Sequence, residues 1–247
     1  MPADIREFHD AVALARALAM HVAQTLSAAV VARGEASLAV SGGRTPVRFF
    51  EALSERPADW SRVTITLVDE RWVPPVSDRS NAGLVARHLI RGPASEARFV
   101  PLTDGLSTPE ARRDTVERTL ASVPWPLDVV VLGMGDDGHT ASLFPGTAAL
   151  DETRAWVVAN DVPQKATRRL TRTAPVLNAA RCVMFAVEGG DKAAPLAEVL
   201  EGPRDPRRLP SQLIAPADGE LLWLIDRAAA AHLTIRPQDP STSRSRS

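Results

Sequence analysis

A histidine and two aspartates stand in a glycine-rich turn in the second half of the chain. His139 follows Asp136 and Asp137, and the residues before this turn, 127–132, form a short valine-rich run. Such a run is typical of a strand buried on both faces of a parallel sheet. Histidine can exchange a proton near neutral pH, and open α/β sheets bind ligands beyond the carboxyl ends of their strands. His139 is therefore a candidate acid–base group; the alternative is an ordinary solvated turn, because Asp-Gly is a common turn pair.

A second candidate site lies near the amino end. Residues 36–40 predict a short strand, and the sequence Ser41-Gly42-Gly43 connects it to a helix that begins near Pro46. A strand, a glycine pair and a helix N-terminus in this order can bind phosphate through backbone N–H groups and the positive end of the helix. The alternative is a plain tight turn before a capped helix, because the sequence is neither a GxGxxG nor a P-loop pattern.

Three charged residues follow another predicted strand. Asp69, Glu70 and Arg71 come directly after residues 63–68, and Ser80-Asn81 then opens a predicted helix. We expect Arg71 and one of the two carboxylates to face a cleft, with a solvated loop as the alternative.

Two later segments carry positive charge. Residues 163–173 predict a basic loop that either binds a small anion or is simply solvated; its cations are Lys165, Arg168, Arg169 and Arg172. Lys192 comes after the glycine pair 189–190 and before a helix. It is a candidate phosphate ligand, with a free surface lysine as the alternative.

The elements that must position these residues alternate along the chain. Long helices are predicted from Asp10 to Arg33 and from Pro109 to Ser122, and a last helix from Asp226 to His232. The basic residues 163–173 are predicted to form a loop. Further strands are predicted at 156–159, 182–187 and 221–225. This alternation predicts a single α/β domain over residues 1–235, with a doubly wound, mostly parallel sheet in a Rossmann-like three-layer α/β/α arrangement. Residues 236–247, rich in Pro, Ser, Thr and Arg, predict a disordered tail.

Composition excludes several classes of function. The formal net charge is −1, with 24% charged and 45% apolar residues, so no overall field attracts nucleic acid or an anionic membrane. We find no basic-then-apolar leader and no apolar stretch that approaches about 18 residues, and we expect a cytoplasmic protein. The single cysteine, Cys182, lies in an apolar run and is expected in the core. A metal site is not expected, because the chain has no His-Glu-x-x-His sequence and no paired cysteines.

Three of these segments together resemble the glucosamine-6-phosphate deaminase/6-phosphogluconolactonase family, and within it the lactonases. They are Ser41–Pro46, Asp69–Pro74 with Ser80-Asn81, and Gly133–Gly146. The third is the most specific, because Ser-Leu-Phe-Pro follows the histidine. The resemblance covers nearly the whole chain, from the first helix to Leu200 and on to about Ile225. It implies the three-layer fold of the sugar-phosphate isomerases and deaminases.

The resemblance also implies roles for individual residues. It assigns catalysis to His139, Asp137 and Arg71, and binding of the substrate phosphate to Ser41, Gly42, Gly43, Arg169 and Lys192. The segment 164–167 departs from the family pattern, so Arg168 remains an alternative to Arg169. Asp137 could fix the tautomer of the histidine or shape the turn. Arg71 could stabilise an oxyanion, contact sugar hydroxyls, or order its loop by pairing with Glu70.

The activity that the resemblance implies is hydrolysis of 6-phospho-D-glucono-1,5-lactone to 6-phospho-D-gluconate, in the oxidative pentose phosphate pathway. His139 would deprotonate the attacking water, and no cofactor or metal is needed because the ester is already activated. The expected partner is the phosphosugar lactone, and the protein is expected to be a monomer or small homo-oligomer. The alternatives are a glucosamine-6-phosphate deaminase and a non-catalytic sugar-phosphate-binding protein. In the deaminases the fifth residue after the histidine is acidic, whereas here it is Phe144, which cannot transfer a proton.

Overall fold

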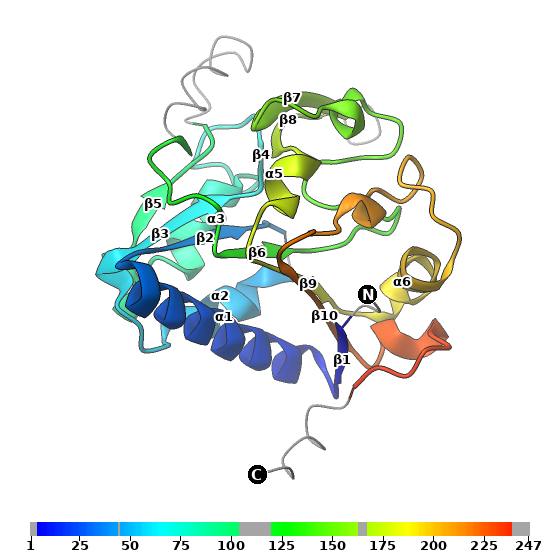
Figure 1. The fold of residues 1–247 in the computed structure, drawn as a ribbon, viewed down its shortest axis with the longest axis horizontal. Coiled ribbons are helices and arrows are strands. Elements are labelled where there is room, and N and C mark those ends of the chain that lie inside the picture. The colour runs from blue at the N-terminus through cyan, green and yellow to red at the C-terminus, as the bar shows by residue number, and fades with distance from the viewer. Residues whose placement is uncertain (1–3, 44, 104–119, 163–166, 239–247) are drawn as a thin grey trace.

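A seven-stranded parallel sheet runs through the middle of the computed structural model, which describes residues 4–43, 45–103, 120–162 and 167–238 (Figure 1). In spatial order its strands are β1 (Asp4–Phe8), β10 (Glu220–Asp226), β9 (Cys182–Val187), β6 (Val129–Leu132), β2 (Ala36–Val40), β3 (Val63–Leu67) and β5 (Arg98–Val100). Every residue of β2, β3, β6 and β9 is buried. This confirms the interpretation of the apolar, β-branched runs as strands covered on both faces. The edge strand β1 was not predicted, because Ile5 is its only buried residue.

The main helices are α1 (Ala11–Arg33), α2 (Pro46–Ser54), α3 (Asn81–His88), α5 (Ala174–Asn178) and α6 (Ala193–Glu201). α1 begins where predicted, because the carboxylate of Asp10 accepts hydrogen bonds from the backbone N–H groups of Val12 and Ala13. It ends at Gly34, which has a left-handed backbone (φ 81°). Contrary to our expectation from sequence, α1 is long and apolar enough to cross a membrane by length and composition. Its Leu14, Leu18, Val22 and Leu26 are buried in the core.

The winding of the sheet reverses between β2 and β6. From β2 the chain moves through α2 to β3 and then through α3 to β5, and it returns to the other side of β2 to form β6, β9 and β10. α1 packs on α2 and α2 on α3, while α6 packs near the short 3₁₀ helix η7 (Ala229–His232). Right-handed crossovers that advance in opposite directions place helices on opposite faces of a sheet, which gives the predicted three layers. Ligands bind in such sheets at the point of reversal.

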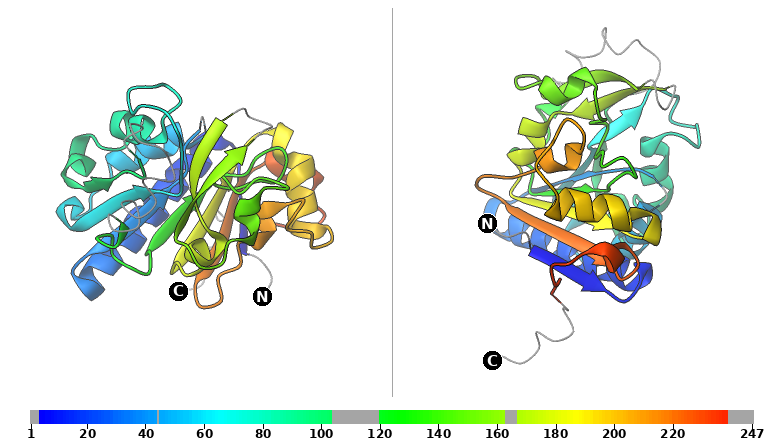
Figure 2. Two further views of the ribbon diagram at one scale, coloured as in Figure 1. Left: turned by 90° about the horizontal axis from the view of Figure 1, so that it is seen from above. Right: turned by 90° about the vertical axis from the view of Figure 1, so that its right-hand side faces the viewer.

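A second, smaller sheet lies apart from the central strands (Figure 1, Figure 2). It is antiparallel and consists of β4 (Asp69–Arg71), β8 (Thr167–Arg172) and β7 (Val157–Val162). The sequence predicted only the start of β7; the segments that form β4 and β8 were expected as loops, and this expectation was wrong. Both are short and rich in charged residues, and they become strands because they pair with each other, Arg71 opposite Arg169.

Near the carboxyl end the structure departs from two predictions. The helix predicted from Asp226 to His232 is only a short 3₁₀ turn, η7. Gln238 forms a bridge beside β1, with its N–H donating to Ile5 O at 2.8 Å, so the beginning of the predicted tail 236–247 is fixed to the sheet. The rest of that tail, most of the predicted helix 109–122, and Lys165 lie outside the described residues.

Candidate active site

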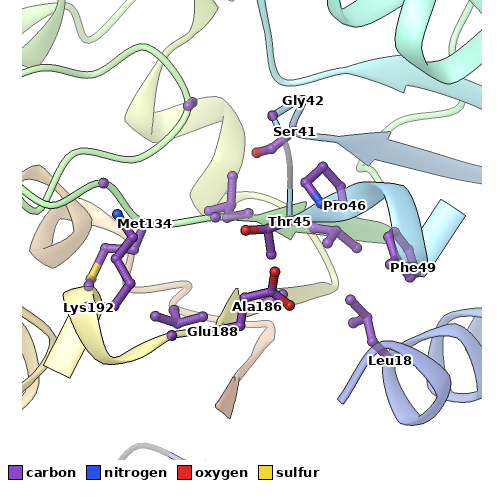
Figure 3. A pocket seen from close by; sticks show the side chains of 18 of the residues that line it. Leu18, Ser41, Gly42, Thr45, Pro46, Phe49, Met134, Ala186, Glu188 and Lys192 are labelled. Carbon is purple, nitrogen blue, oxygen red and sulfur yellow. The ribbon is translucent and has the colours of Figure 1, made fainter. Parts of the chain in front are cut away.

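A cavity of about 530 Å³ opens at the carboxyl ends of β2, β6 and β9, at the point where the winding reverses. Small-molecule sites commonly have volumes of about 300–1,000 Å³. One wall is apolar and consists of Leu14 and Leu18 from α1 and Phe49 from α2. Figure 3 shows Leu18 and Phe49 on one side of the pocket and Lys192 on the other, with Thr45 between them. The rest of the lining is mostly polar and comes from the loops that follow the strands.

His139 reaches this pocket from the turn after β6. The carboxylate of Asp137 accepts a hydrogen bond from the backbone N–H of His139 at 3.1 Å and also contacts the ring atom Nδ1. Burial by itself raises the pKa of Asp137, but the hydrogen bond and charge of His139 outweigh it and bring that pKa down to about 2. Asp137 therefore shapes the turn and holds the ring at once. With Nδ1 facing Asp137, Nε2 is the ring nitrogen left to accept a proton.

Two neighbours fix the plane of the imidazole. The ring of Phe144 stacks on it, with centroids 3.9 Å apart and an interplanar angle of 20°. Gly135 lies behind it, and a Cβ atom there would come within 2.0 Å of His139 Nδ1, so a glycine is required for this close approach. Gly138 closes the turn in a left-handed conformation (φ 72°). Gly135 and Gly138 therefore have defined roles in placing the histidine.

The loop after β2 supplies hydrogen-bond donors to the pocket. Ser41, Gly42 and Gly43 line it, and α2 begins at Pro46 as predicted. Thr45, which directly precedes Pro46, has helical backbone angles and makes no capping hydrogen bond with its side chain. The hydroxyl of Ser41 is buried with no hydrogen-bond partner among the described residues. A buried hydroxyl without a partner is costly, and a ligand in the pocket would provide one.

Arg169 and Arg168 lie on opposite sides of β8. Arg169 lines the pocket, with a side chain only 10% exposed, whereas Arg168 is exposed and donates to Asp161 at 2.8 Å. Arg169 Nη1 donates to Ser142 Oγ at 3.3 Å, and its Nε is buried with no partner among the described residues. Burial lowers the pKa of Arg169, and the carboxylate of Asp69, 3.7 Å away, opposes that shift. Arg169 is therefore the arginine in a position to bind an anion in the pocket.

Arg71 enters the pocket from β4 and is held by α3. Its guanidinium donates to Asn81 Oδ1 at 2.8 Å and to the main-chain oxygen of Arg79 at 2.9 Å. Glu70, which we considered as its partner, has another role. At the start of α3, its buried carboxylate accepts hydrogen bonds from the backbone N–H groups of Asn81 and Ala82 and from the Ser80 hydroxyl. It also accepts one from the backbone N–H of Arg71, and burial raises its pKa. The side chain of Arg71 is thus left to face the pocket, and Glu70 anchors the helix beside it.

Lys192 follows β9 and the glycine pair 189–190, as the last residue of a short 3₁₀ turn. Its side chain is 21% exposed, and Nζ lies 3.3 Å from the carboxylate of Asp191. Glu188 also lines this side of the pocket and pairs with Arg48 at 3.5 Å. Burial raises the pKa of Glu188, while Arg48 opposes that shift.

All of the predicted site residues except Asp137 line one pocket. His139, Arg71, Ser41, Gly42, Gly43, Arg169 and Lys192 all line the same pocket. Asp137 supports His139 from outside the lining. No role was predicted for several further polar residues in the pocket, among them Asn81, Glu188, Asp191 and Asp226. Asn81 was noted only with Ser80, as the start of a helix and as part of a segment that resembles the family.

Possible metal ligands gather elsewhere in the molecule. Among the described residues, one group of three has its donor atoms within 4.8 Å of one another: His21, Cys182 and Glu220. Cys182 and Glu220 are the first residues of β9 and β10. They therefore lie at the amino ends of these strands, whereas the pocket lies at the carboxyl ends. Burial raises the pKa of the Cys182 thiol to about 12, which disfavours the thiolate that a metal requires. The expectation that the pocket works without a metal or cofactor stays a prediction.

Comparison with known proteins identifies similar chains. Residues 9–223 match the profile of a family described as glucosamine-6-phosphate isomerases/6-phosphogluconolactonase. The chain is 46% identical to a 6-phosphogluconolactonase of Pseudomonas aeruginosa over 217 residues, which are 85% of this chain and 90% of that protein. It is 49% identical to a 6-phosphogluconolactonase of Rhizobium meliloti over 203 residues, 80% and 88% of the two chains. The crystal structure of a 6-phosphogluconolactonase from Shewanella baltica has a TM-score of 0.86 at 38% identity, covering 91% of this chain and 97% of that one.

Proposed function

The chain belongs to the family of glucosamine-6-phosphate isomerases and 6-phosphogluconolactonases, and we propose that it hydrolyses 6-phospho-D-glucono-1,5-lactone to 6-phospho-D-gluconate. This reaction belongs to the oxidative pentose phosphate pathway. We further propose that the enzyme is cytoplasmic, that it is a monomer or small homo-oligomer, and that it needs no cofactor.

His139 is the proposed general base. Its Nε2 takes a proton from water as the water oxygen attacks the lactone carbonyl carbon, which forms a tetrahedral intermediate. The bond between that carbon and the ring oxygen then breaks, and His139 returns the proton to the leaving ring oxygen. The products are a hydroxyl and a carboxylic acid on the opened chain, and the acid then releases its proton to solvent as the carboxylate forms. A positioned acid–base group typically contributes about 10²–10⁴-fold to such a step.

The anionic end of the substrate has a proposed binding site in the same pocket. Arg169, Lys192 and the backbone N–H groups of Gly42 and Gly43 would bind the phosphate, and Ser41 would donate from its hydroxyl. The buried Ser41 Oγ and Arg169 Nε, which lack partners among the described residues, support this assignment. Arg71 is proposed to stabilise the oxyanion or to bind sugar hydroxyls. Binding the phosphate fixes the carbonyl near His139, which reduces the entropic part of the barrier.

The observation that carries the choice of reaction is the stack of Phe144 on His139. In the deaminases an acidic side chain at this position would serve the opening of the sugar ring. Phenylalanine carries no transferable proton, whereas hydrolysis of a lactone requires only one acid–base group near the carbonyl. The presence of His139 in the pocket also distinguishes an enzyme from a protein that only binds sugar phosphates, since binding needs no proton acceptor.

A substrate comparison tests this function. The purified protein is incubated with fresh 6-phosphogluconolactone and, separately, with glucosamine 6-phosphate, at a pH where the lactone hydrolyses slowly by itself. We expect lactone hydrolysis well above background and no release of ammonia. Ammonia release without faster lactone hydrolysis would replace the lactonase by a deaminase, and no reaction with either compound would favour a binding protein.

A further inference from the structure

Asn81, the first residue of α3, lies between two polar segments of the pocket, β4 and the loop after β2. Its side chain is buried, and the residue is only 1% exposed. Its Oδ1 accepts a hydrogen bond from Arg71 Nη1 at 2.8 Å. Its Nδ2 donates to the main-chain oxygen of Asp69 at 2.8 Å and lies 3.3 Å from the Asp69 carboxylate. One amide group therefore uses its acceptor on an arginine and its donor on an aspartate.

The same amide lies directly against the loop after β2. A Cβ atom on Gly42 would lie 1.9 Å from Asn81 Oδ1, 2.2 Å from its Cγ and 2.8 Å from its Nδ2. Gly42 is not among the glycines with a left-handed backbone. The requirement for glycine at this position therefore comes from the contact with Asn81. The distance between the Gly42 backbone and the Arg71 guanidinium is set by a single intervening side chain.

We propose that Asn81 is a positioning residue that holds Arg71 in register with the phosphate-binding loop. The proposal rests on the lactonase function given above, in which the loop binds one end of the substrate and Arg71 acts at the sugar or its carbonyl. An asparagine suits this task because it orients the guanidinium without neutralising it, so the full positive charge remains available to the substrate. An aspartate in the same place would form an ion pair with Arg71 and would also place a second carboxylate beside Asp69.

A double-mutant cycle tests the coupling between the two residues. We measure kcat/KM of lactone hydrolysis for wild type, Asn81→Ala, Arg71→Ala and the double variant. Asn81→Ala is expected to lower kcat/KM by about tenfold in wild type and by less than about twofold when Arg71 is already absent, because residues in contact are not additive. Equal losses in both backgrounds would overturn the proposal.

Ser80→Ala is the matched control for a purely structural effect. Ser80 caps the same helix, with its Oγ accepting from Gly83 N at 3.0 Å and donating to Glu70, but it does not line the pocket. This variant should lower the melting temperature and leave kcat/KM within about twofold of wild type, since loss of a cap affects stability. If Ser80→Ala and Asn81→Ala lose activity equally, Asn81 acts only through the fold of α3.

Asn81→Asp keeps the size of the side chain. This variant replaces Asn81→Ala in the test if the alanine variant does not fold. We expect it to lose at least about tenfold in kcat/KM, since the new carboxylate neutralises Arg71. Wild-type activity of Asn81→Asp would contradict the proposal.

The contact with Gly42 is tested separately by melting temperature, which does not depend on the identity of the substrate. Gly42→Ala should melt well below wild type, and Asn81→Ala should relieve part of that loss in the double variant, since it removes the three atoms that the new Cβ would meet. Additive losses would exclude this contact. If wild type does not hydrolyse the lactone but the melting temperatures show this relief, the proposed function fails while the placement of Asn81 stands.

Discussion

At the scale of single residues, the imidazole of His139 is oriented before any substrate binds. Asp137 contacts Nδ1, Phe144 covers one face of the ring, and the missing side chain of Gly135 leaves room behind it. Arg169 lies over the same phenyl ring, 5.1 Å from its centroid, so the phenyl ring contacts both the proposed base and a proposed phosphate ligand. Groups held in this way need little reorganisation during the reaction.

The contact between Asp137 and His139 leads to a prediction about stability and pH. The pKa of Asp137 in the folded protein is about 2, below the 3.8 of an unperturbed aspartate, so the ionised carboxylate stabilises the fold. This contribution is complete above about pH 4 and is lost as the pH falls through about 2. Asp137→Asn should therefore be less stable than wild type near neutral pH, and the difference should shrink on acidification.

Urea unfolding of both proteins at several pH values measures this difference. A gap in the free energy of unfolding that stays constant or widens toward low pH would mean that the ionised carboxylate gains nothing from His139.

Sequence reasoning identified the residues that contact the pocket better than the residues that hold them. His139, Arg71 and Lys192 were marked by their charge and by their place after a predicted strand. The role of Glu70 was not predictable, because its partners at the start of α3 are fixed only when β4 and α3 are brought together. The role of Asn81 was not predicted for the same reason, since an asparagine at the start of a helix has an ordinary local explanation.

At the scale of elements, the small antiparallel sheet decides which of two adjacent arginines enters the pocket. Arg169 and Arg168 are neighbours in β8, and neighbouring residues of a strand point to opposite faces. The sequence left this choice open, because β8 has no alternation of apolar and polar residues and reads as a basic loop. Arg172, another buried residue of β8, contacts a segment distant in the chain, since it donates to Leu67 O at 2.9 Å.

A pair of variants tests this assignment. Arg169→Ala should raise KM for the lactone by at least about tenfold, because a charge-assisted contact with the phosphate is lost, with a smaller effect on kcat. Arg168→Ala is the matched control and should leave both constants close to wild type. Steady-state kinetics of the two proteins decide between the arginines, and a larger rise in KM for Arg168→Ala would reverse the assignment.

At the scale of the whole molecule, the pocket lies where the sheet changes its direction of winding. The loops after β2 and β6 diverge there, and they carry the proposed phosphate ligands and the proposed base, respectively. The alternation of strands and helices made the layered fold predictable from sequence. The apolar wall from α1 was not predictable, because Leu14 and Leu18 fit the core-facing pattern of any amphipathic helix.

Binding of the reaction product should stabilise the whole fold. At a concentration of 6-phosphogluconate about 100 times its dissociation constant, the free energy of unfolding should rise by about 2.7 kcal/mol. Lys192→Ala should lose much of this gain, since it removes a proposed phosphate ligand, and His139→Ala should keep most of it. Thermal melting with and without the product provides the measurement. Equal stabilisation of Lys192→Ala and wild type would remove Lys192 from the phosphate site.

The most direct test is the rate of lactone hydrolysis by wild type and His139→Ala, measured side by side and corrected for spontaneous hydrolysis. We expect kcat to fall by about 10²-fold or more in the variant, as is usual when a general base is lost, while the product still raises its melting temperature. If His139→Ala binds the product and retains most of the wild-type kcat, His139 is not the base that activates water.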